Sequence, residues 1–230
     1  MDNRGNVRAY YERVIADHGA TPQGVGYRCA GSWSGVHSAL RALLGTMRGQ
    51  RMLDVGCGHG QMTAPWAASN DVVGVDYAEG MCLAARDAGL VTVSADANAL
   101  PFTDSAFDVA TAVEVLQHLP DARWIMAELA RVVRPGGVII VGTANRRSLI
   151  RQASHVAMEL GLLGRASPDD IGLPVLRSIG DVHALGAGVG FTARSEATTY
   201  FPFRWSGVHR QSGFIRELLA SNFLVKFDKP

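Results

Sequence analysis

The sequence predicts an α/β fold in which a mostly parallel sheet of seven strands carries helices on both faces. Between residues 50 and 145, short apolar runs alternate with segments of helical pattern. The apolar runs show no polar alternation, which is typical of parallel strands buried on both faces. The 230 residues are 47% hydrophobic with a net charge of +1. This composition excludes a disordered chain and gives no electrostatic reason to expect a nucleic acid partner.

The first 49 residues are predicted to form a helical cover. One helix is expected from Val7 to His18, where Gly19 ends it, and another from Val36 to Met47. Residues 20–35 are rich in Gly and Ser, which is typical of irregular structure. Tyr10 and Tyr11 on the first helix are interpreted as core packing or as part of the cover.

Residues 50–144 contain five apolar runs, and each is predicted to be a strand. The strands are expected at 51–56, 71–76, 91–96, 107–116 and 137–144, with helices at about 60–69, 78–88 and 121–134. In an open α/β sheet, ligands bind at the carboxyl ends of the strands. This segment is therefore predicted to be a cofactor-binding core.

Residues 145–178 interrupt the alternation and are predicted to form a lid. They contain a candidate helix at 146–163 and a loop with Pro168 and Pro174. The insertion follows the carboxyl end of the fifth strand, so we expect it to lie over a substrate. Residues 179–230 are expected to complete the sheet with helices at 179–187 and 212–220 and strands at 190–201 and 222–230. The whole chain, 1–230, is thus predicted to be one domain.

The segment LDVGCGHGQ, residues 53–61, carries the strongest motif. Asp54 lies at the end of the first strand, and Gly56, Gly58 and Gly60 follow at alternate positions. Glycine permits positive φ and close approach of a ligand to the backbone. A strand, a glycine turn and a helix start together form a nucleotide-type pocket. A tight turn without a ligand is the simpler alternative.

Asp76 ends the second strand, 20 residues beyond Gly56. A carboxylate here can accept hydrogen bonds from both hydroxyls of a ribose, or it can cap the helix that follows. A dinucleotide fingerprint would need its third glycine at position 61, which is Gln. Asp54 would also repel a pyrophosphate and attract a cationic amine. The pattern therefore favours S-adenosylmethionine over NAD.

Four segments carry a resemblance to a known family. They are LDVGCGHG (53–60), VVGVDYAEGM (72–81), SADANALPFTDSAFDVATAVEVLQHLPD (94–121) and ELARVVRPGGVIIVGTAN (128–145). In order and spacing they resemble the class I S-adenosylmethionine-dependent methyltransferases of the ubiquinone/menaquinone-biosynthesis-like group. The resemblance implies a Rossmann-like sheet, S-adenosyl-L-methionine as cofactor and S-adenosyl-L-homocysteine as product.

The resemblance also implies cofactor-binding roles for the residues of these segments. The methionine part would lie along Gly56, Cys57, Gly58 and Gly60, with Asp54 toward its amino group. Asp76 would hold the ribose, and Tyr77 and Met81 would lie on the adenine side. Asp96 would contact the adenine amino group, and the Ala97 backbone would contact the adenine ring. Val113 and Glu114 would lie near the sulfonium. Alternatively, Met81 only packs in the core beneath its helix, and Asp96 only caps a turn.

His118 follows the fourth strand, at the edge where a substrate is expected. It is the candidate catalytic residue, because a histidine can take a proton from a hydroxyl that is being methylated. A structural histidine at the start of the next turn is the alternative. Some quinone O-methyltransferases have Glu-x-x-Glu-His here and bind a metal. In this chain Gln117 replaces the second carboxylate, which weakens a site for a hard cation, so no metal is predicted.

The sequence therefore predicts a methyltransferase that acts on a small hydrophobic molecule. O-methylation of a phenol, quinone or polyketide hydroxyl is the main hypothesis, and N- or C-methylation of a natural product or lipid is the alternative. An NAD(P)-dependent oxidoreductase and a catalytically silent methyltransferase-like binding protein are more remote. The amino terminus has no apolar signal region, and no apolar run approaches the roughly 18 residues of a membrane span. We expect a cytoplasmic protein without integral membrane association.

Overall fold

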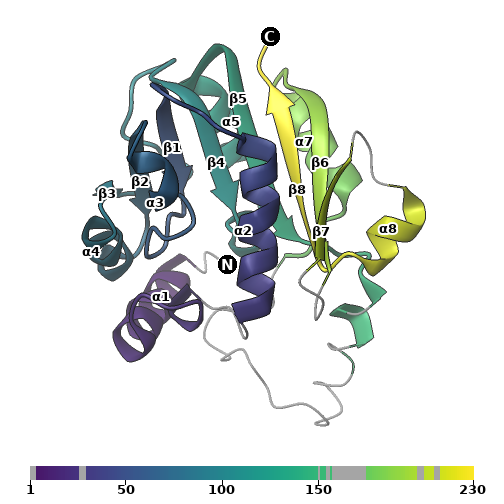
Figure 1. The fold of residues 1–230 in the computed structure, drawn as a ribbon, viewed down its shortest axis with the longest axis horizontal. Helices are drawn as coiled ribbons and strands as arrows, with labels where there is room; N and C mark the ends of the chain where they lie inside the picture. Colours follow the sequence, from purple (N-terminus) through teal and green to yellow (C-terminus); the bar gives the residue numbers. More distant parts are fainter. Residues whose placement is uncertain are drawn as a thin grey trace.

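The computed structural model describes residues 4–25, 30–149, 151–153, 156, 175–200, 205–209 and 213–230. Their strands form one eight-stranded sheet in the order β3-β2-β1-β4-β5-β8-β6-β7 (Figure 1). The predicted α/β fold class is confirmed, but the expected number of seven strands is wrong. The additional strand is β7, Trp205–His209, which pairs antiparallel with β6 at the edge of the sheet. Its five residues include a glycine and form no apolar run, so pairing with β6 defines it.

The elements have the following bounds. The other strands are β1 Arg51–Val55, β2 Asp71–Asp76, β3 Val91–Ser94, β4 Phe107–Val113, β5 Val133–Ala144, β6 Thr192–Tyr200 and β8 Asn222–Asp228. The helices are α1 Arg4–His18, α2 Ala30–Leu44, α3 Ala64–Ala67, α4 Glu79–Asp87, α5 Arg123–Val132, α7 Ile179–Gly188 and α8 Phe214–Leu219, with the 3-10 turns η1 Gln23–Val25 and η2 Leu116–His118.

The first five strands run parallel to one another. β1 pairs with β2 and β4, β2 pairs with β3, and β4 pairs with β5. β8 lies antiparallel between β5 and β6. Because parallel strands end at the same edge, the residues that follow β1 to β4 meet there. We call this edge of the sheet the carboxyl edge.

Alternate residues of the strands build a core on each face of the sheet. Leu53 on β1 packs in the cluster that contains Ile125 of α5 and Val182 of α7. Its neighbour Met52 packs in the opposite cluster, which contains Leu40 of α2. Figure 1 shows α2 in front of the sheet and α5 and α7 behind it. Helix α2 is therefore a core helix on one face.

Several elements differ in their bounds from those expected: β5, for example, begins at Val133 instead of 137, and three further cases have a visible cause in the backbone. α2 begins at Ala30 and ends at Leu44, where Gly45 takes a φ of +66°. α3 covers only Ala64–Ala67, because the chain before it forms a turn through Gly60, whose φ is +81°. β4 ends at Val113 instead of 116, because Glu114 takes a φ of +62°. The positive φ values thus account for the end of α2, the late start of α3 and the end of β4.

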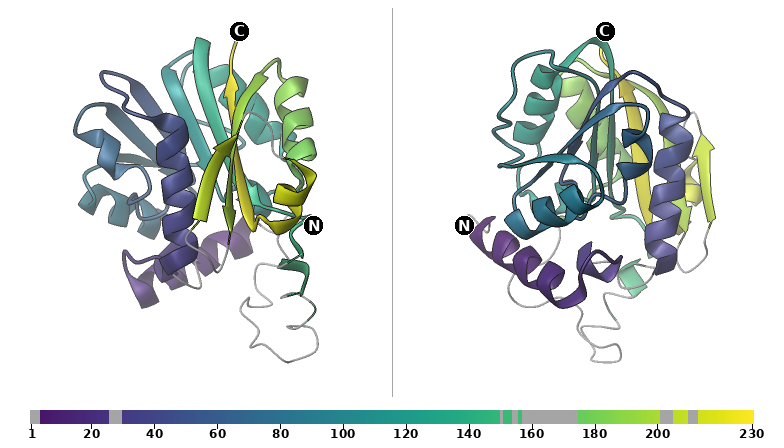
Figure 2. Two further views of the ribbon diagram at one scale, coloured as in Figure 1. Left: turned by 45° about the vertical axis from the view of Figure 1, so that its right-hand side comes forward. Right: turned by 60° about the vertical axis from the view of Figure 1, so that its left-hand side comes forward.

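Helix α1 crosses the carboxyl edge beside α4, as the two views of Figure 2 show. Ile15 of α1 packs against Ala78 and Met81 at the start of α4. α1 thus lies where the sequence predicts a cover. Residues 150, 154–155 and 157–174 of the predicted lid lie outside the described residues, so the lid stays a prediction. No helix among the described residues is long and apolar enough to cross a membrane.

Candidate active site

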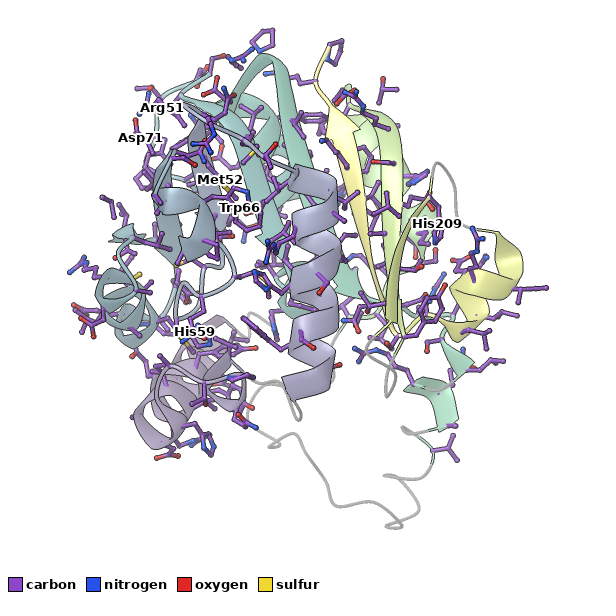
Figure 3. The ribbon with its side chains drawn as sticks, in the orientation of Figure 1. Arg51, Met52, His59, Trp66, Asp71 and His209 are labelled. Carbon is purple, nitrogen blue, oxygen red and sulfur yellow. The ribbon has the colours of Figure 1, made fainter. Side chains whose placement is uncertain are left out.

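A glycine turn, residues 56–60, joins β1 to α3 at the carboxyl edge. Gly56, Gly58 and Gly60 have φ values of +71°, +53° and +81°, a region that favours glycine. The N–H groups of Gly56 and Cys57 both donate to the Val75 carbonyl, at 2.7 and 3.0 Å. The turn is thereby fixed against β2. His59 of the turn lies beside α1, whereas Arg51 and Asp71, which begin β1 and β2, lie at the opposite edge (Figure 3).

Two valines crowd this turn. A Cβ added at Gly56 would lie 2.2 Å from Val115 Cγ2, and one at Gly58 would lie 2.6 Å from Val25 Cγ1. Val115 directly precedes η2, and Val25 ends η1. The glycines are therefore required by space as well as by φ, and residues from both ends of the site enclose the turn.

Asp54, near the end of β1, is buried with 3% of its surface exposed. Its carboxylate accepts hydrogen bonds from Thr63 Oγ1 and Thr111 Oγ1, both at 2.7 Å. Burial raises the pKa of Asp54 to about 6 in spite of these two bonds, and the nearby Asp76 carboxylate adds to the rise. A cationic group placed here would favour the ionised form of Asp54.

Asp76 connects the glycine turn to α4. Its Oδ2 accepts from the Gly58 N–H and its Oδ1 from the Ala78 N–H, each at 2.9 Å. Burial raises the pKa of Asp76, while these backbone donors oppose the rise. The alternative role of a helix cap is not seen, because the N-cap of α4 is Ala78 and no side chain caps it; Asp76 binds the Ala78 N–H just before the helix. Each carboxylate oxygen retains a second lone pair, so these bonds do not prevent an additional bond to a ribose hydroxyl.

Three further predicted cofactor-binding residues, Tyr77, Met81 and Cys57, differ in exposure. Tyr77 is 37% exposed, and the Arg8 guanidinium of α1 lies 5.6 Å from the centroid of its ring. Met81 is 1% exposed and packs with Ile15, which favours the core alternative for this residue. Cys57 is buried close to Gly74, where a Cβ would lie 2.8 Å from the sulfur. Only Tyr77 of these three presents substantial surface.

Asp96 and Ala97 follow β3. Asp96 Oδ1 accepts from the Asn98 N–H at 2.9 Å, so the turn-capping alternative is present here. The Ala95 N–H donates to the Asp76 carbonyl at 3.0 Å, which places this segment beside the end of β2. Ala97 is half-buried against the core. The segment is therefore adjacent to Asp76, as a binding role would require.

Val113 and Glu114 mark the end of β4. Val113 is half-buried against the α2 side of the core. Glu114 Oε1 accepts from Asn222 Nδ2 at 2.8 Å. Asn222 begins β8, which is separated from β4 by β5. The glycine turn follows β1, which is the neighbour of β4 on its other side. The Glu114 carboxylate is therefore engaged away from the glycine turn, and burial raises its pKa against the attraction of Arg151.

His118 lies in η2 and contacts α1. Its Nε2 is 2.9 Å from the hydroxyl oxygen of Tyr11, and the two rings meet edge to face at 85°. Burial lowers the pKa of His118 to about 4, so the imidazole is neutral at pH 7. Burial also raises the pKa of Tyr11, and the charges of Tyr10, Asp76 and Glu114 add to that rise. The candidate base therefore has a half-buried phenol as its partner.

The turn that carries His118 is held by the end of the predicted lid. Arg177 is 7% exposed, and its guanidinium donates to the Leu116 carbonyl and, at 2.7 Å, to the Leu119 carbonyl. The Val175 N–H donates to the Gln117 carbonyl at 2.8 Å. A displacement of this segment would therefore move the turn on which His118 lies.

The residues from Glu114 to His118 are not arranged as a metal site. The Gln117 side chain accepts from the Ala144 N–H at 3.4 Å, while Glu114 and His118 have the partners given above. In the part of the chain that the structure describes, no group of three or more His, Cys, Asp or Glu side chains could hold an ion. The absence of a metal requirement stays a prediction from Gln117.

Two consecutive residues of α1 bind η2 and the start of α4, which lie in different parts of the site. Tyr11 contacts His118, and Glu12 accepts from the Glu79 and Gly80 N–H groups at 2.6 and 2.9 Å. A carboxylate is favoured there because the amino terminus of α4 carries partial positive charge. Neither the Tyr11–His118 contact nor the role of Glu12 is predicted from the sequence. No local pattern could show them, since 107 and 67 residues separate the partners.

Comparisons with known proteins match part of this chain to a known family. Residues 53–141 match the family model described as a methyltransferase domain. Over 113 residues the chain is 37% identical to 27-O-demethylrifamycin SV methyltransferase from Amycolatopsis mediterranei, covering 45% of this chain and 42% of that protein. Over 115 residues it is 36% identical to ubiquinone biosynthesis O-methyltransferase from Bordetella avium, covering 46% and 48%. The chain thus matches less than half the length of these curated relatives.

The fold extends the comparison to the full chain. The crystal structure of magnesium protoporphyrin IX methyltransferase from Synechocystis with bound S-adenosylhomocysteine is similar, with a TM-score of 0.69, 17% identity and 100% coverage of both chains. By its fold, the chain is a Rossmann-like protein of the class I methyltransferase type. Residues 53–141, the segment that matches the methyltransferase domain, lie within this fold, and the same Synechocystis enzyme is also known with S-adenosylmethionine bound.

The residues at the carboxyl edge fit this cofactor. Asp54 and Asp76 are two buried carboxylates, and the charge of Asp76 raises the pKa of Asp54. The ammonium and sulfonium of S-adenosylmethionine are cations that would offset this repulsion. The glycine turn beside these carboxylates carries no side chain at three of its five positions. This donor set suits a cation better than a pyrophosphate.

Proposed function

We propose that the protein transfers a methyl group from S-adenosylmethionine to a hydroxyl of a small hydrophobic molecule. The observation that carries this proposal is the neutral His118 at the carboxyl edge, paired with Tyr11. A hydroxyl must lose its proton as its oxygen is methylated, so a base in this position serves O-methylation. Both relatives described above are O-methyltransferases by name, which supports this choice.

The cofactor, when bound, supplies a methyl group already activated by the positive sulfur. The chain's own residues are left with binding, orientation and proton removal. In the proposal Asp54 binds the amino group, Asp76 binds the ribose, and Asp96 with Ala97 contacts the adenine. Gly56, Gly58 and Gly60 let the ligand approach the backbone. Holding donor and acceptor in line can contribute roughly 7–11 kcal/mol to such a reaction.

A hydrophobic acceptor is inferred from the apolar insertion at 145–178. Its anchor at Arg177 holds the turn that carries His118. In the proposal the insertion closes over the acceptor and excludes water while His118 removes the proton. N- or C-methylation remains the alternative; an amine acceptor that is already neutral would not need a base.

Two measurements test the proposed function. Isothermal titration with S-adenosylmethionine, S-adenosylhomocysteine, NADH and NADPH is expected to show saturable binding of the first two only. Transfer of a radiolabelled methyl group is then measured with a panel of catechols, hydroquinones and matched anilines. Methylation of the hydroxyl compounds is expected. Failure of the folded protein to bind either sulfur compound would contradict the cofactor role, and exclusive methylation of the anilines would contradict the O-methyl assignment.

A further inference from the structure

A cavity of about 390 Å³ lies at the edge of the sheet opposite the carboxyl edge, where the parallel strands begin. Helix α2 runs along the sheet and ends at Leu44 at this edge (Figure 1). The cavity is enclosed by that helix end, by the loop of residues 45–50 and by strands β4, β5 and β8. The described residues that line it include none with a cofactor or acceptor role in the proposed reaction. Small-molecule sites usually measure about 300–1,000 Å³, so the cavity has room for a small ligand.

The floor of the cavity is apolar. It is formed by Val109 of β4 and Val138 of β5, which pair with each other in the sheet, together with Leu44 and Met47. All four belong to the hydrophobic cluster on the α2 face. Val138 and Met47 are only half-buried. A ligand with an apolar body would remove their remaining surface from water, which is favourable in proportion to the area covered.

Two cationic side chains, Arg48 and Lys226, line the same cavity, and no Asp or Glu of the described residues does. Lys226 on β8 is half-buried, and its Nζ donates to the Leu43 carbonyl at 2.8 Å. An ammonium group has three protons, so it can donate to a ligand as well. Arg48 is exposed and takes part in none of the ion pairs between described residues. The lining is therefore positively charged above an apolar floor.

The carboxylates near the cavity have cationic partners of their own. Asp108, at the start of β4, accepts from the Arg134 guanidinium at 2.6 Å. Asp228 lies 3.3 Å from the Arg194 guanidinium, and these two residues act on Lys226 in opposite senses. Burial lowers the pKa of Lys226, and an anion placed in the cavity would oppose that change. An external anion would thus meet little competition from the chain's own acids.

The negative end of α2 is also largely occupied by donors. Carbonyl groups at the end of a helix carry partial negative charge, which would repel an anion. The Gly45 N–H donates to the Arg41 carbonyl at 2.9 Å, and Trp66 Nε1 donates to the Gly45 carbonyl at 3.2 Å. The Leu43 carbonyl accepts from Lys226. These bonds offset the repulsion and leave the two cations of the lining to face a ligand.

We propose that this cavity binds an amphipathic monocarboxylate, with its carboxylate between Arg48 and Lys226 and its apolar body over Val109 and Val138. The site is separate from the cofactor and the acceptor, and the proposal does not depend on the methyl transfer proposed above. Two cations would attract a free phosphate or acetate as well. Neither ion would cover the apolar floor, so the lining favours a carboxylate that carries a hydrocarbon chain or ring.

Octanoate is the probe, and titration calorimetry on the full chain measures its binding. We expect saturable binding at one site, with equal affinity in the presence and absence of S-adenosylhomocysteine, because the cofactor residues lie at the other edge. Acetate and octylammonium at the same concentrations are expected to show no saturable binding. A higher salt concentration is expected to weaken octanoate binding, since it screens the two cations.

Thr46 offers a matched pair of variants, because it is exposed and lines the cavity. Thr46→Glu places a like charge beside the carboxylate, and we expect it to lower octanoate affinity about tenfold. Thr46→Gln has nearly the same size without the charge and is expected to stay within about twofold of the wild type. Lys226→Met removes the ammonium but keeps an apolar chain, with an expected loss of about tenfold to a hundredfold. Arg41→Met, an exposed change on α2 outside the cavity, is the control.

Met47 provides a readout of position. Its ¹³C-methyl resonance, assigned with Met47→Leu, is expected to shift when octanoate saturates the protein. The resonance of Met81, which packs beside α1 at the carboxyl edge, is expected to stay unchanged. A shift of Met81 without a shift of Met47 would place octanoate in the catalytic region and overturn the proposal.

Three further results would contradict the site. Absence of saturable octanoate binding by the folded wild type would exclude it. Equal affinity for octanoate and octylammonium would show that the cations do not select the ligand. Equal octanoate affinity in Thr46→Glu and Thr46→Gln, or an unchanged affinity in a folded Lys226→Met, would show that the carboxylate does not lie where the structure places the positive charge.

Discussion

At the residue scale, Asp54 is a buried carboxylate whose negative charge would attract the ammonium group of the cofactor. It is 3% exposed, and two threonine hydroxyls donate hydrogen bonds to its carboxylate, which offset part of the cost of ionisation. Its pKa of about 6 lies close to neutral pH. The protonation state of this one carboxylate therefore becomes a sensitive indicator of what binds beside it.

We expect the affinity for S-adenosylhomocysteine to fall as the pH drops through about 6, because Asp54 takes up a proton and no longer attracts the ammonium. Asp54→Asn is expected to bind roughly tenfold to a hundredfold more weakly, the usual range for a lost charged hydrogen bond, and to lose this pH dependence. Titration calorimetry between pH 5 and pH 8 measures both effects. Asp71→Asn, at the opposite edge, serves as the control (Figure 3). An unchanged pH profile in Asp54→Asn would contradict the assignment.

At the element scale, the glycine turn is defined by its neighbours as much as by its own dihedral angles. Gly45 has a φ of +66°, close to the +71° of Gly56, but a Cβ at Gly45 would meet nothing within 4 Å among the described atoms. The same Cβ at Gly56 would lie 2.2 Å from Val115. A comparison of the two positions therefore separates the cost of a positive φ from the cost of a clash with Val115.

Gly56→Ala and Gly45→Ala are both expected to lose about 1–3 kcal/mol of stability through the strained φ. Only Gly56→Ala must also displace Val115, so we expect it alone to weaken S-adenosylhomocysteine binding, by more than tenfold. Urea unfolding and calorimetry measure the two effects. The double variant Gly56→Ala/Val115→Ala is expected to recover part of the affinity. Equal affinity in the two single variants would show that contact with Val115 does not matter.

The anchoring of α1 is a second property at this scale. Glu12→Gln removes the charge at the amino terminus of α4 and leaves one of the two N–H groups of Glu79 and Gly80 facing an amide donor. We expect a loss of about 0.5–2 kcal/mol, as for other helix caps, and faster hydrogen exchange over Arg4–His18. Exchange followed by mass spectrometry checks this. Asp17→Asn, an exposed change of the same charge on α1, is expected to leave the rates unchanged. Equal rates in both variants would refute the anchor.

The scale of elements is also where the sequence was most informative. The apolar runs predicted the five parallel strands, and alternate glycines after β1 predicted the turn. The strand β7, the direction of the Glu114 side chain and the Tyr11–His118 pair were not predicted. Each depends on residues distant in sequence: Tyr200 pairs with Trp205 only once β6 is in place, and Asn222 reaches Glu114 across 108 residues. Periodicity reports burial, but it carries no information on such pairs.

At the scale of the whole molecule, two buried groups oppose each other in the pH dependence of stability. The pKa of Asp54 is raised from 3.8 to about 6, so between these values the folded state binds more protons and the free energy of unfolding falls as the pH rises. The pKa of His118 is lowered from 6.5 to about 4. Between those values the unfolded state binds more protons, and the free energy of unfolding rises with pH.

We therefore expect Asp54→Asn to show a steeper rise of Tm between pH 4 and pH 6 than the wild type, because one of the groups that oppose the contribution of His118 is then removed. The difference corresponds to about 2–3 kcal/mol, or several degrees for a chain of this size. Scanning calorimetry of both proteins across this range makes the comparison, with Asp17→Asn as the exposed control. Parallel Tm curves for Asp54→Asn and wild type would exclude an elevated pKa at Asp54.

Two neighbouring side chains of α1 bind two different parts of the site. Tyr11 holds the turn after β4, and Glu12 holds the start of α4. While α1 keeps both contacts, neither the turn after β4 nor the start of α4 can separate from it alone. In the proposed reaction, release of S-adenosylhomocysteine and entry of the next acceptor would both require α1 to move, and the rate of that movement would then limit both steps.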